Sequence, residues 1–253
     1  MGTWSTDFNE YSVGPMPADW SELGTAVTIT IVDGTGVGAN IGGTNAMYFD
    51  NSLNGNSGGR WSIPDYAPMP PTGYRETLSR NRTDDGLYAN SVRLQIGTMM
   101  TARNANRYDA VGLVQPSTGV STKTIGWRLR NSDGIHEDIN IGTTIANIDM
   151  GDWVWMRVRW DYDTTTTHAK FWQGDVTDEP GGWDVSFDYS TYGQVSTLYP
   201  DDLFGIFNYN FRNGTTQYCD YFACGTNEAA PSPGGGPTPV VQVNNAPIIG
   251  SAF

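Results

Sequence analysis

Residues 152–183 read DWVWMRVRWDYDTTTTHAKFWQGDVTDEPGGW, and this stretch decides the fold. From Val154 to Tyr162 every second residue is apolar, which is the period of a half-buried β-strand. The tetrad Thr164–Thr167 then turns the chain into a second strand, Ala169–Trp172. Pro and Gly in the acidic segment that follows stop strand pairing, so we expect Trp183 to pack back across the sheet edge. The stretch predicts two antiparallel strands of a β-sandwich.

Similar apolar alternation, bounded by turn residues, recurs along most of the chain and predicts further sandwich strands. The expected strands are residues 25–32, 46–50, 88–98, 110–114, 124–130, 135–141, 154–162, 169–172, 185–189, 203–211 and 217–223. Asp133-Gly134 and Asn213-Gly214 each lie between two such runs and predict tight hairpins. Residues 51–71 predict a long loop. With 31 Gly, 14 Pro and no amphipathic helix, the 253-residue chain is expected to form one large all-β domain.

The formal charge of −13 opposes binding to nucleic acid or to anionic membranes, since both need a basic surface. No apolar run is long enough to cross a membrane. Residues 1–20 lack the basic and apolar regions of a secretory signal, which favours a protein released by another route, such as a virion protein freed by lysis.

The two cysteines and two histidines indicate no catalytic or metal chemistry. Cys219 and Cys224 are five residues apart, so a regular strand would place them on opposite faces, and we expect small buried thiols without a disulfide. His136 and His168 each lie beside an expected turn, where a solvated surface role is the simplest interpretation.

The C-terminal part changes character. We expect the sandwich to span residues 1–226, a Pro/Gly linker to span 227–239, and an apolar docking tail to span 240–253. The anchoring side chains of the tail are Val240, Val241, Val243, Ile248, Ile249 and Phe253. Apolar residues beyond a linker are costly to leave in water, so the tail should dock either on its own sandwich or on a neighbouring subunit.

Four segments together resemble one superfamily: DFNEYSVGPMPADW near the start, DWVWMRVRW, AKFWQGDVTDEPGGW, and QYCDYFACGTN near residue 226. Their order is similar to that of the concanavalin A-like (laminin-G-like) jelly rolls found in lectins, carbohydrate-binding modules, polysaccharide hydrolases and bacteriophage structural proteins. The resemblance covers roughly residues 4–226. It implies two stacked antiparallel sheets, one of them concave, with ligands across that sheet or in loops at its edge.

Hydrolases on this fold place acidic residues at alternate positions along one strand, and polysaccharide hydrolysis needs two carboxylates about 5–10 Å apart. No such acidic ladder is recognised here. Glu137 and Asp138 fall on opposite faces, and Asp161 and Asp163 fall at a strand end. We therefore expect no catalytic residues and no enzymatic activity.

A cluster of basic side chains is the main binding hypothesis. Alternation places five arginines on the outward side of their strands: Arg93, Arg128, Arg130, Arg157 and Arg159. With Trp155 beside them, they predict one sheet face that binds an acidic or hydroxylated glycan, because Arg offers forked donors and Trp a flat apolar surface. The alternative is that they pair across strands with carboxylates such as Asp138 and Asp161.

Calcium is the metal that the resemblance implies. Asp7, near the first strand, and Asp220, in the last, would converge if those strands are neighbours, and their oxygens suit Ca²⁺. Turn-forming Asp explains most acidic residues without a metal.

The preferred hypothesis is a non-enzymatic bacteriophage virion protein: a capsid decoration protein, head fibre or tail-associated adhesin. Its tail would bind other virion proteins, its jelly roll could bind host or environmental polysaccharide, and it would be a homo-oligomer or lattice-bound. A carbohydrate-binding module and a polysaccharide hydrolase or lyase are the alternatives.

Overall fold

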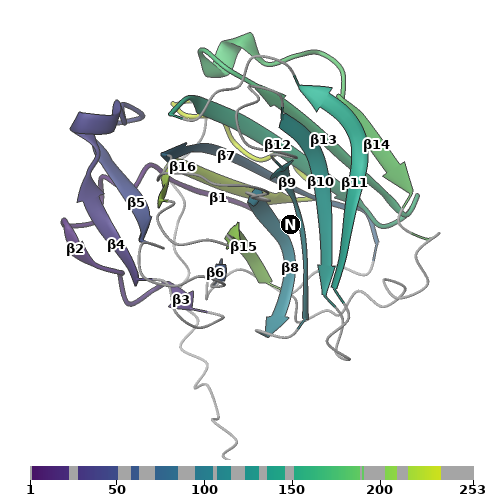
Figure 1. Ribbon diagram of the computed structural model, residues 1–253, viewed down its shortest axis with the longest axis horizontal. Coiled ribbons are helices and arrows are strands. Elements are labelled where there is room, and N and C mark those ends of the chain that lie inside the picture. Colours follow the sequence, from purple (N-terminus) through teal and green to yellow (C-terminus); the bar gives the residue numbers. More distant parts are fainter. Residues whose placement is uncertain are drawn as a thin grey trace, which may run out of the picture.

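The computed structural model is built from two antiparallel β-sheets, and Figure 1 shows them as two layers. It describes residues 2–22, 28–50, 58–62, 72–84, 95–104, 107–114, 123–130, 136–145, 151–188, 190, 203–209 and 216–234. For the strands between residues 95 and 145, it describes the backbone pairing. The all-β, two-sheet antiparallel fold class predicted from the sequence is confirmed.

The larger sheet has nine strands. They are β1 (Gly2–Thr6), β2 (Gly14–Pro15), β4 (Thr28–Asp33), β5 (Asn45–Asp50), β7 (Tyr74–Asp84), β12 (Trp153–Asp161), β13 (Thr166–Trp172), β14 (Val185–Asp188) and β16 (Thr216–Thr226). Their order is β14-β13-β12-β7-β16-β5-β4-β2, and β1 pairs with the second half of β16. Figure 1 shows β2, β4 and β5 at the left end of this sheet.

The smaller sheet has seven strands. They are β3 (Ser21–Glu22), β6 (Gly58–Ser62), β8 (Gln95–Asn104), β9 (Arg107–Val114), β10 (Lys123–Arg130), β11 (His136–Ile145) and β15 (Leu203–Tyr209). Their order is β11-β10-β9-β8-β15-β6-β3. Two short 3₁₀ turns have described bounds, η1 (Thr35–Val37) and η2 (Val176–Asp178).

The two sheets enclose an apolar core. Its buried members are Phe8, Trp20, Ile29, Ile31, Met47, Phe49, Ile206, Cys219, Phe222 and Cys224. Ile206 comes from β15 of the smaller sheet, and most of the others come from strands of the larger sheet, so this cluster holds the layers together. Burying such side chains stabilises the fold by roughly 1.5–3 kcal/mol each.

Strand β7 is central to the larger sheet, and the sequence did not predict it. It pairs with β12 along nine residues and with β16 along most of its length. Its sequence, YRETLSRNRTD, holds one aliphatic residue, Leu78, although residues 75–81 are all buried. Polar side chains can occupy a central strand only when partners satisfy them, so β7 depends on residues far away in the sequence.

A β-bulge changes the faces of β16. The register against β7 shifts between Cys219 and Tyr221, leaving Asp220 as the extra residue. Cys219 and Cys224 consequently belong to the same core cluster, so the expectation that they face opposite sides is wrong. Both are free and buried, as predicted.

Two other local predictions are corrected. Asn213-Gly214 does not join a hairpin, because β15 and β16 lie in different sheets and the connection crosses from one to the other. Gly58–Ser62, inside the expected loop 51–71, forms β6. Asp133-Gly134 lies outside the described residues, although β10 and β11 on either side of it pair as expected. Among the described residues, no helix is long and apolar enough to span a membrane.

Candidate functional site

The face of the larger sheet that points away from the smaller sheet, here called the outer face, carries a second apolar cluster. It contains Leu78, Trp155, Trp172, Tyr221, Ala223 and Ala230, with Ile41 and Val176 packed against it. Trp155 stacks on Trp172 with ring centroids 6.0 Å apart. Trp155 lies on the outward side of its strand, as predicted, but it is only 1% exposed, so its indole does not offer the open ligand-binding surface expected from the sequence. Segments outside the sheet cover it.

One covering segment is the β13–β14 loop, residues 173–184. Trp155 Nε1 donates to the Gly174 carbonyl at 3.2 Å, and Trp172 Nε1 donates to the Asp175 carbonyl at 3.0 Å. Asp175 caps the short η2 turn by accepting from the Thr177 amide. The loop is thereby fixed on the outer face, and its later residues are brought over β12 and β13.

The other covering segment is residues 227–232, here called the strap. Asn227 exchanges two hydrogen bonds of 2.8 Å with the backbone of Tyr74, and the Tyr221 hydroxyl donates to the Pro231 carbonyl at 2.7 Å. A Cβ at Gly225 would lie 2.3 Å from the Glu228 carbonyl oxygen, so this close approach requires glycine. The prediction of a linker beginning at residue 227 is therefore wrong for the strap, which packs on its own sandwich. Residues 235–253, including the predicted docking tail, lie outside the described residues.

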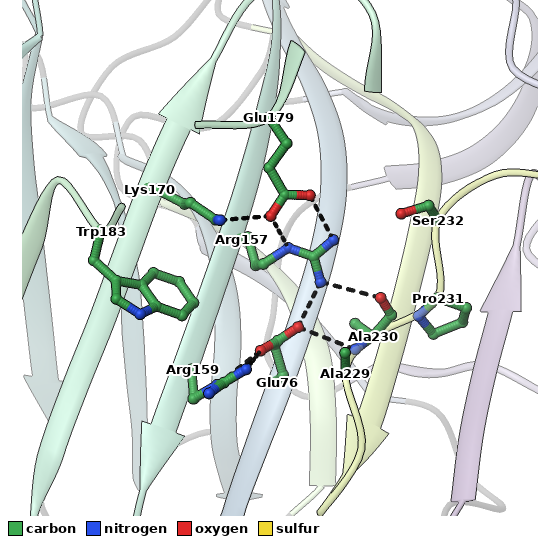
Figure 2. A pocket seen from close by; sticks show the side chains of 10 residues that line it. All are labelled: Glu76, Arg157, Arg159, Lys170, Glu179, Trp183, Ala229, Ala230, Pro231 and Ser232. Atoms are coloured by element: carbon green, nitrogen blue, oxygen red, sulfur yellow. Dashed lines mark hydrogen bonds and ion pairs between the residues drawn. The ribbon is translucent and has the colours of Figure 1, made fainter. Parts of the chain in front are cut away.

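A network of charged side chains lies between the strap and the loop (Figure 2). Glu76, on β7, is 1% exposed, and both its oxygens are engaged. Its Oε1 accepts from Arg157 Nη1 and from the Ala230 amide at 3.1 Å, and its Oε2 accepts from Arg159 Nε at 2.8 Å. The Ala230 carbonyl in turn accepts from Arg157 at 3.1 Å. One buried carboxylate thus joins β7, β12 and the strap.

Glu179, from the β13–β14 loop, completes the network. Arg157 approaches it with two nitrogens, at 2.7 and 2.8 Å, and Lys170 Nζ lies 2.6 Å from Glu179 Oε1 and 2.8 Å from the Pro180 carbonyl. Burial alone would raise the pKa of Glu179, but the hydrogen bonds and charges of Arg157 and Lys170 lower it. Burial would likewise lower the pKa of Arg157, and the two glutamates raise it. The Arg157–Glu179 pair therefore stays ionised at neutral pH.

Trp183 forms one side of an open pocket in this region (Figure 2). Its ring stacks on His168 at 5.4 Å and lies 5.0 Å from Lys170 Nζ and 5.4 Å from the Arg159 guanidinium. These three side chains project from adjacent strands on the same face, so one face of the half-buried indole rests on them. This confirms that Trp183 packs back over the sheet. The pocket has a volume of about 450 Å³, and the strap forms its opposite wall.

His168 differs from the expected solvated surface group. It is half-buried beneath Trp183, and its Nδ1 lies 2.7 Å from the Ser186 hydroxyl. Burial lowers its pKa, and the charge of Arg159 lowers it further, while Asp161 opposes both. The imidazole is therefore neutral at physiological pH and suited to stacking against the indole.

The predicted arginine face is only partly correct. Arg157 and Arg159 lie together in the pocket, but Arg128 and Arg130 lie on β10 of the other sheet. A single face that unites them is therefore wrong, because alternation reports the side of a strand and not the sheet to which the strand belongs. Arg93 lies outside the described residues.

The alternative of cross-strand pairing is correct in principle, with different partners. Arg157 and Arg159 pair with Glu76 and Glu179 rather than with Asp161. On β10, the backbone register places Arg128 directly opposite Asp138, one of the carboxylates proposed for this role.

Asp7 and Asp220 both lie beside the loop of residues 40–43, as expected if their strands are neighbours. Asp220 Oδ2 accepts from the Asn40 amide, and Asn9, held by Asp7, donates to the Ile41 carbonyl. Asp220 is fully buried, however, and lies 2.8 Å from Arg80, whose guanidinium opposes a nearby divalent cation. This donor set does not fit Ca²⁺. In the described part of the chain, no three His, Cys, Asp or Glu side chains are grouped as a metal site requires.

Sequence reasoning missed Glu76, Lys170, Glu179 and Ala230. Lys170 and Glu179 stood within the segment identified as decisive, so the spacing of Lys170, Glu179 and Trp183 around the turn was an available signal. Glu76 and Ala230 gave no such signal in the sequence, since their role depends on their contact with each other, and they are 154 residues apart.

No protein-family model and no curated protein matches this sequence. Solved structures do resemble it. The cellulose-induced protein Cip1 has a TM-score of 0.56 and 14% sequence identity, and the match covers 89% of this chain and 97% of Cip1. The Lotus tetragonolobus seed lectin has a TM-score of 0.52 and 9% identity, and the match covers 88% of this chain and 97% of the lectin. A conserved carbohydrate esterase from the Shiga toxin-encoding bacteriophage phi24B has 0.51 and 12% over 83% and 90%. These likenesses show a lectin-like, concanavalin A-type jelly-roll fold.

Replacing Glu76 by Gln should weaken both the fold and the attachment of the strap. The change leaves the buried Arg157 and the half-buried Arg159 beside a neutral partner, which should lower the free energy of unfolding by about 3–5 kcal/mol. It should also expose the strap to elastase cleavage near Ala230. Glu179→Gln is the matched control. The Glu179 side chain is 23% exposed, so this replacement should lower the free energy of unfolding by less than Glu76→Gln does. Urea unfolding at pH 7 and limited proteolysis measure both effects. Equal stability of the two variants, with an uncleaved strap, would contradict this account.

Proposed function

We propose that this lectin-like jelly roll is a non-enzymatic glycan-binding protein whose binding site is the outer-face pocket beside Trp183. The observation that carries the proposal is the position of the indole, with one face resting on His168, Lys170 and Arg159. An aromatic ring held flat on a sheet provides a rigid apolar surface at low entropic cost, on which a sugar ring can stack.

The composition of the pocket supports this function. A volume of about 450 Å³ is within the range of small-ligand sites, and its lining combines one aromatic wall with a few fixed polar groups. The strap contributes residues 229–232 as a second wall, and the Ser232 hydroxyl on it can exchange hydrogen bonds with a sugar hydroxyl. Both walls are fixed by the Glu76–Arg157–Glu179 network, so little ordering is needed when a ligand binds.

The same network argues against glycoside hydrolysis at this pocket. Hydrolysis by a carboxylate pair needs one carboxyl group that holds a proton near neutral pH. Arg157 and Lys170 instead lower the pKa of Glu179, and both oxygens of Glu76 accept from guanidinium groups. A polysaccharide hydrolase or lyase is the alternative function, and product release from plant, algal or bacterial polysaccharides would establish it.

We further propose that the protein is carried on a bacteriophage particle, as a capsid decoration protein, head fibre or tail-associated adhesin. The apolar residues 240–253 beyond the Pro/Gly segment suit an anchor to other virion proteins. The likeness to a bacteriophage carbohydrate esterase is compatible with that setting. The alternative is a carbohydrate-binding module that is not part of a particle. The strap packs on the sandwich in either case, so it does not distinguish the two roles.

Trp183→Ala should reduce glycan affinity about tenfold or more, because a buried aromatic contact commonly dominates a binding site. Binding is measured on an array of plant, algal and bacterial glycans and quantified by calorimetry for those that bind. Val13→Ala serves as the control, since Val13 is 60% exposed and precedes β2 at the opposite end of the sheet. Unchanged affinity of the Trp183 variant would exclude this pocket, and no glycan bound by the wild type would exclude the function.

Removing residues 235–253 should abolish incorporation into particles without weakening the sandwich. The deletion begins after the strap, so the contacts of Ala230 and Pro231 remain and the unfolding temperature should not change. Particle occupancy of the full and shortened chains, measured by quantitative mass spectrometry of purified virions, tests the proposal. Equal occupancy would refute anchoring by the tail.

A further inference from the structure

The pocket carries a local excess of positive charge in a strongly acidic protein. Three cationic side chains and two carboxylates line it, whereas the whole chain has a formal charge of −13. The Debye length is about 8 Å at physiological ionic strength, so distant surface carboxylates are largely screened from a ligand in the pocket. The charge that such a ligand meets is therefore set by the nearby groups.

Arg157 is not available to a ligand. It is 7% exposed, and its guanidinium is shared among Glu76, Glu179 and the Ala230 carbonyl. Its function is to fix the floor and both walls of the pocket.

Arg159 is placed differently. It lies beside the Trp183 ring, as Lys170 does, but Lys170 is 8% exposed and so offers a ligand its charge rather than an open donor. The Arg159 side chain is 31% exposed and directs Nε and Nη2 toward the same oxygen of Glu76. A guanidinium has five N–H donors, so Arg159, which lines the pocket, has donors beyond those that engage Glu76. Lys170 has three donors, and its described acceptors are Glu179 and the Pro180 carbonyl.

Tyr74 fixes the orientation of Arg159 from the other side. The guanidinium lies 4.3 Å from the Tyr74 ring centroid and 5.4 Å from that of Trp183. A guanidinium held by two rings and one carboxylate loses little freedom when it binds, and its planar fork matches a carboxylate.

From this geometry we infer that the pocket selects acidic glycans, specifically sugars that carry a carboxylate, such as uronic acids. The inference rests on the proposed glycan-binding function and names its ligand class. The pyranose ring stacks on Trp183, and its carboxylate meets Arg159 in the same pocket, with the charge of Lys170 close by. A neutral sugar retains the stacking and loses the ionic contact. A sulfate ester is also anionic, but it is tetrahedral and fits the planar fork less well.

The test compares oligosaccharides from alginate, pectin and glucuronan with their carboxyl-reduced forms and with sulfated neutral oligosaccharides. Calorimetry on the full chain at 0.15 M salt should show wild-type affinity for at least one uronate about tenfold above that for its reduced form. Arg159→Gln should abolish the preference, so that the variant binds the uronate and its reduced form with similar affinity. Arg159→Lys should give an intermediate loss, because it keeps the charge without the fork.

Arg82→Gln is the matched control. Arg82 lies on β7, the strand of Glu76, and on the same face of the sheet. It is also paired with a carboxylate, Asp84, and it is six residues from Glu76, or about 20 Å. Its replacement should leave the uronate preference intact. Thermal unfolding should confirm that the Arg159 variants are folded, since Arg157 and Ala230 still engage Glu76.

The outcomes separate this inference from the proposed function. Equal affinity for uronate and reduced sugar, lost in Trp183→Ala, would overturn acid selection and leave glycan binding in place. An acid preference that survives in Arg159→Gln, or equal binding of the sulfated sugars, would also overturn the inference. Absence of binding to any glycan would overturn both.

Discussion

The arrangement of the outer face depends on one buried carboxylate, that of Glu76. A carboxylate removed from water is costly unless charged and hydrogen-bonding partners surround it. Those partners are Arg157 and Arg159, both on β12, and the Ala230 amide in the strap. The Arg157 charge is also neutralised by Glu179, which lies in the β13–β14 loop. This contact holds the loop over the sheet, and Trp183 in the same loop is positioned with it. The strap, the loop and the pocket thus follow from the same requirement.

A second buried ion pair on the same strand obeys the same logic. Arg80 lies 2.8 Å from Asp220, the bulged residue of β16, and its guanidinium lies over the rings of Trp153 and Trp155. Burial raises the pKa of Asp220 to about 6, with the Arg80 charge acting in the opposite direction. Because a buried ion pair commonly adds little net stability, its expected role here is to fix the register of β7 against β16. The two pairs together explain how a polar strand can lie at the centre of the larger sheet.

Several features could be predicted from the sequence because their causes are local. The alternation in β12, the turn into the next strand and the return of Trp183 all depend on residues within one short stretch. The structure contains all three, with the turn at residues 162–165 rather than at 164–167. Strand β7 could not be predicted in the same way. Its polarity indicates a loop unless its partners are known, and Arg157 and Asp220 are 81 and 140 residues away from the residues that they pair with.

The site shows the same limit. The parity of Arg157 and Arg159 was correct, but sheet membership separates them from Arg128 and Arg130. The strap has the composition of a linker, and its contacts with distant residues such as Glu76 and Tyr221 reveal that it is docked.

Amide hydrogen exchange at Ala230 tests the central claim most directly, because that amide donates to Glu76 at the point where the strap meets the network. Followed by NMR on the full chain at neutral pH, its exchange should be slower than that of an unstructured peptide by about 100-fold or more, as for an amide released only by local opening. Exchange at the unstructured rate, while the amides of β12 remain protected, would show that the strap is not held by Glu76 and would contradict the account.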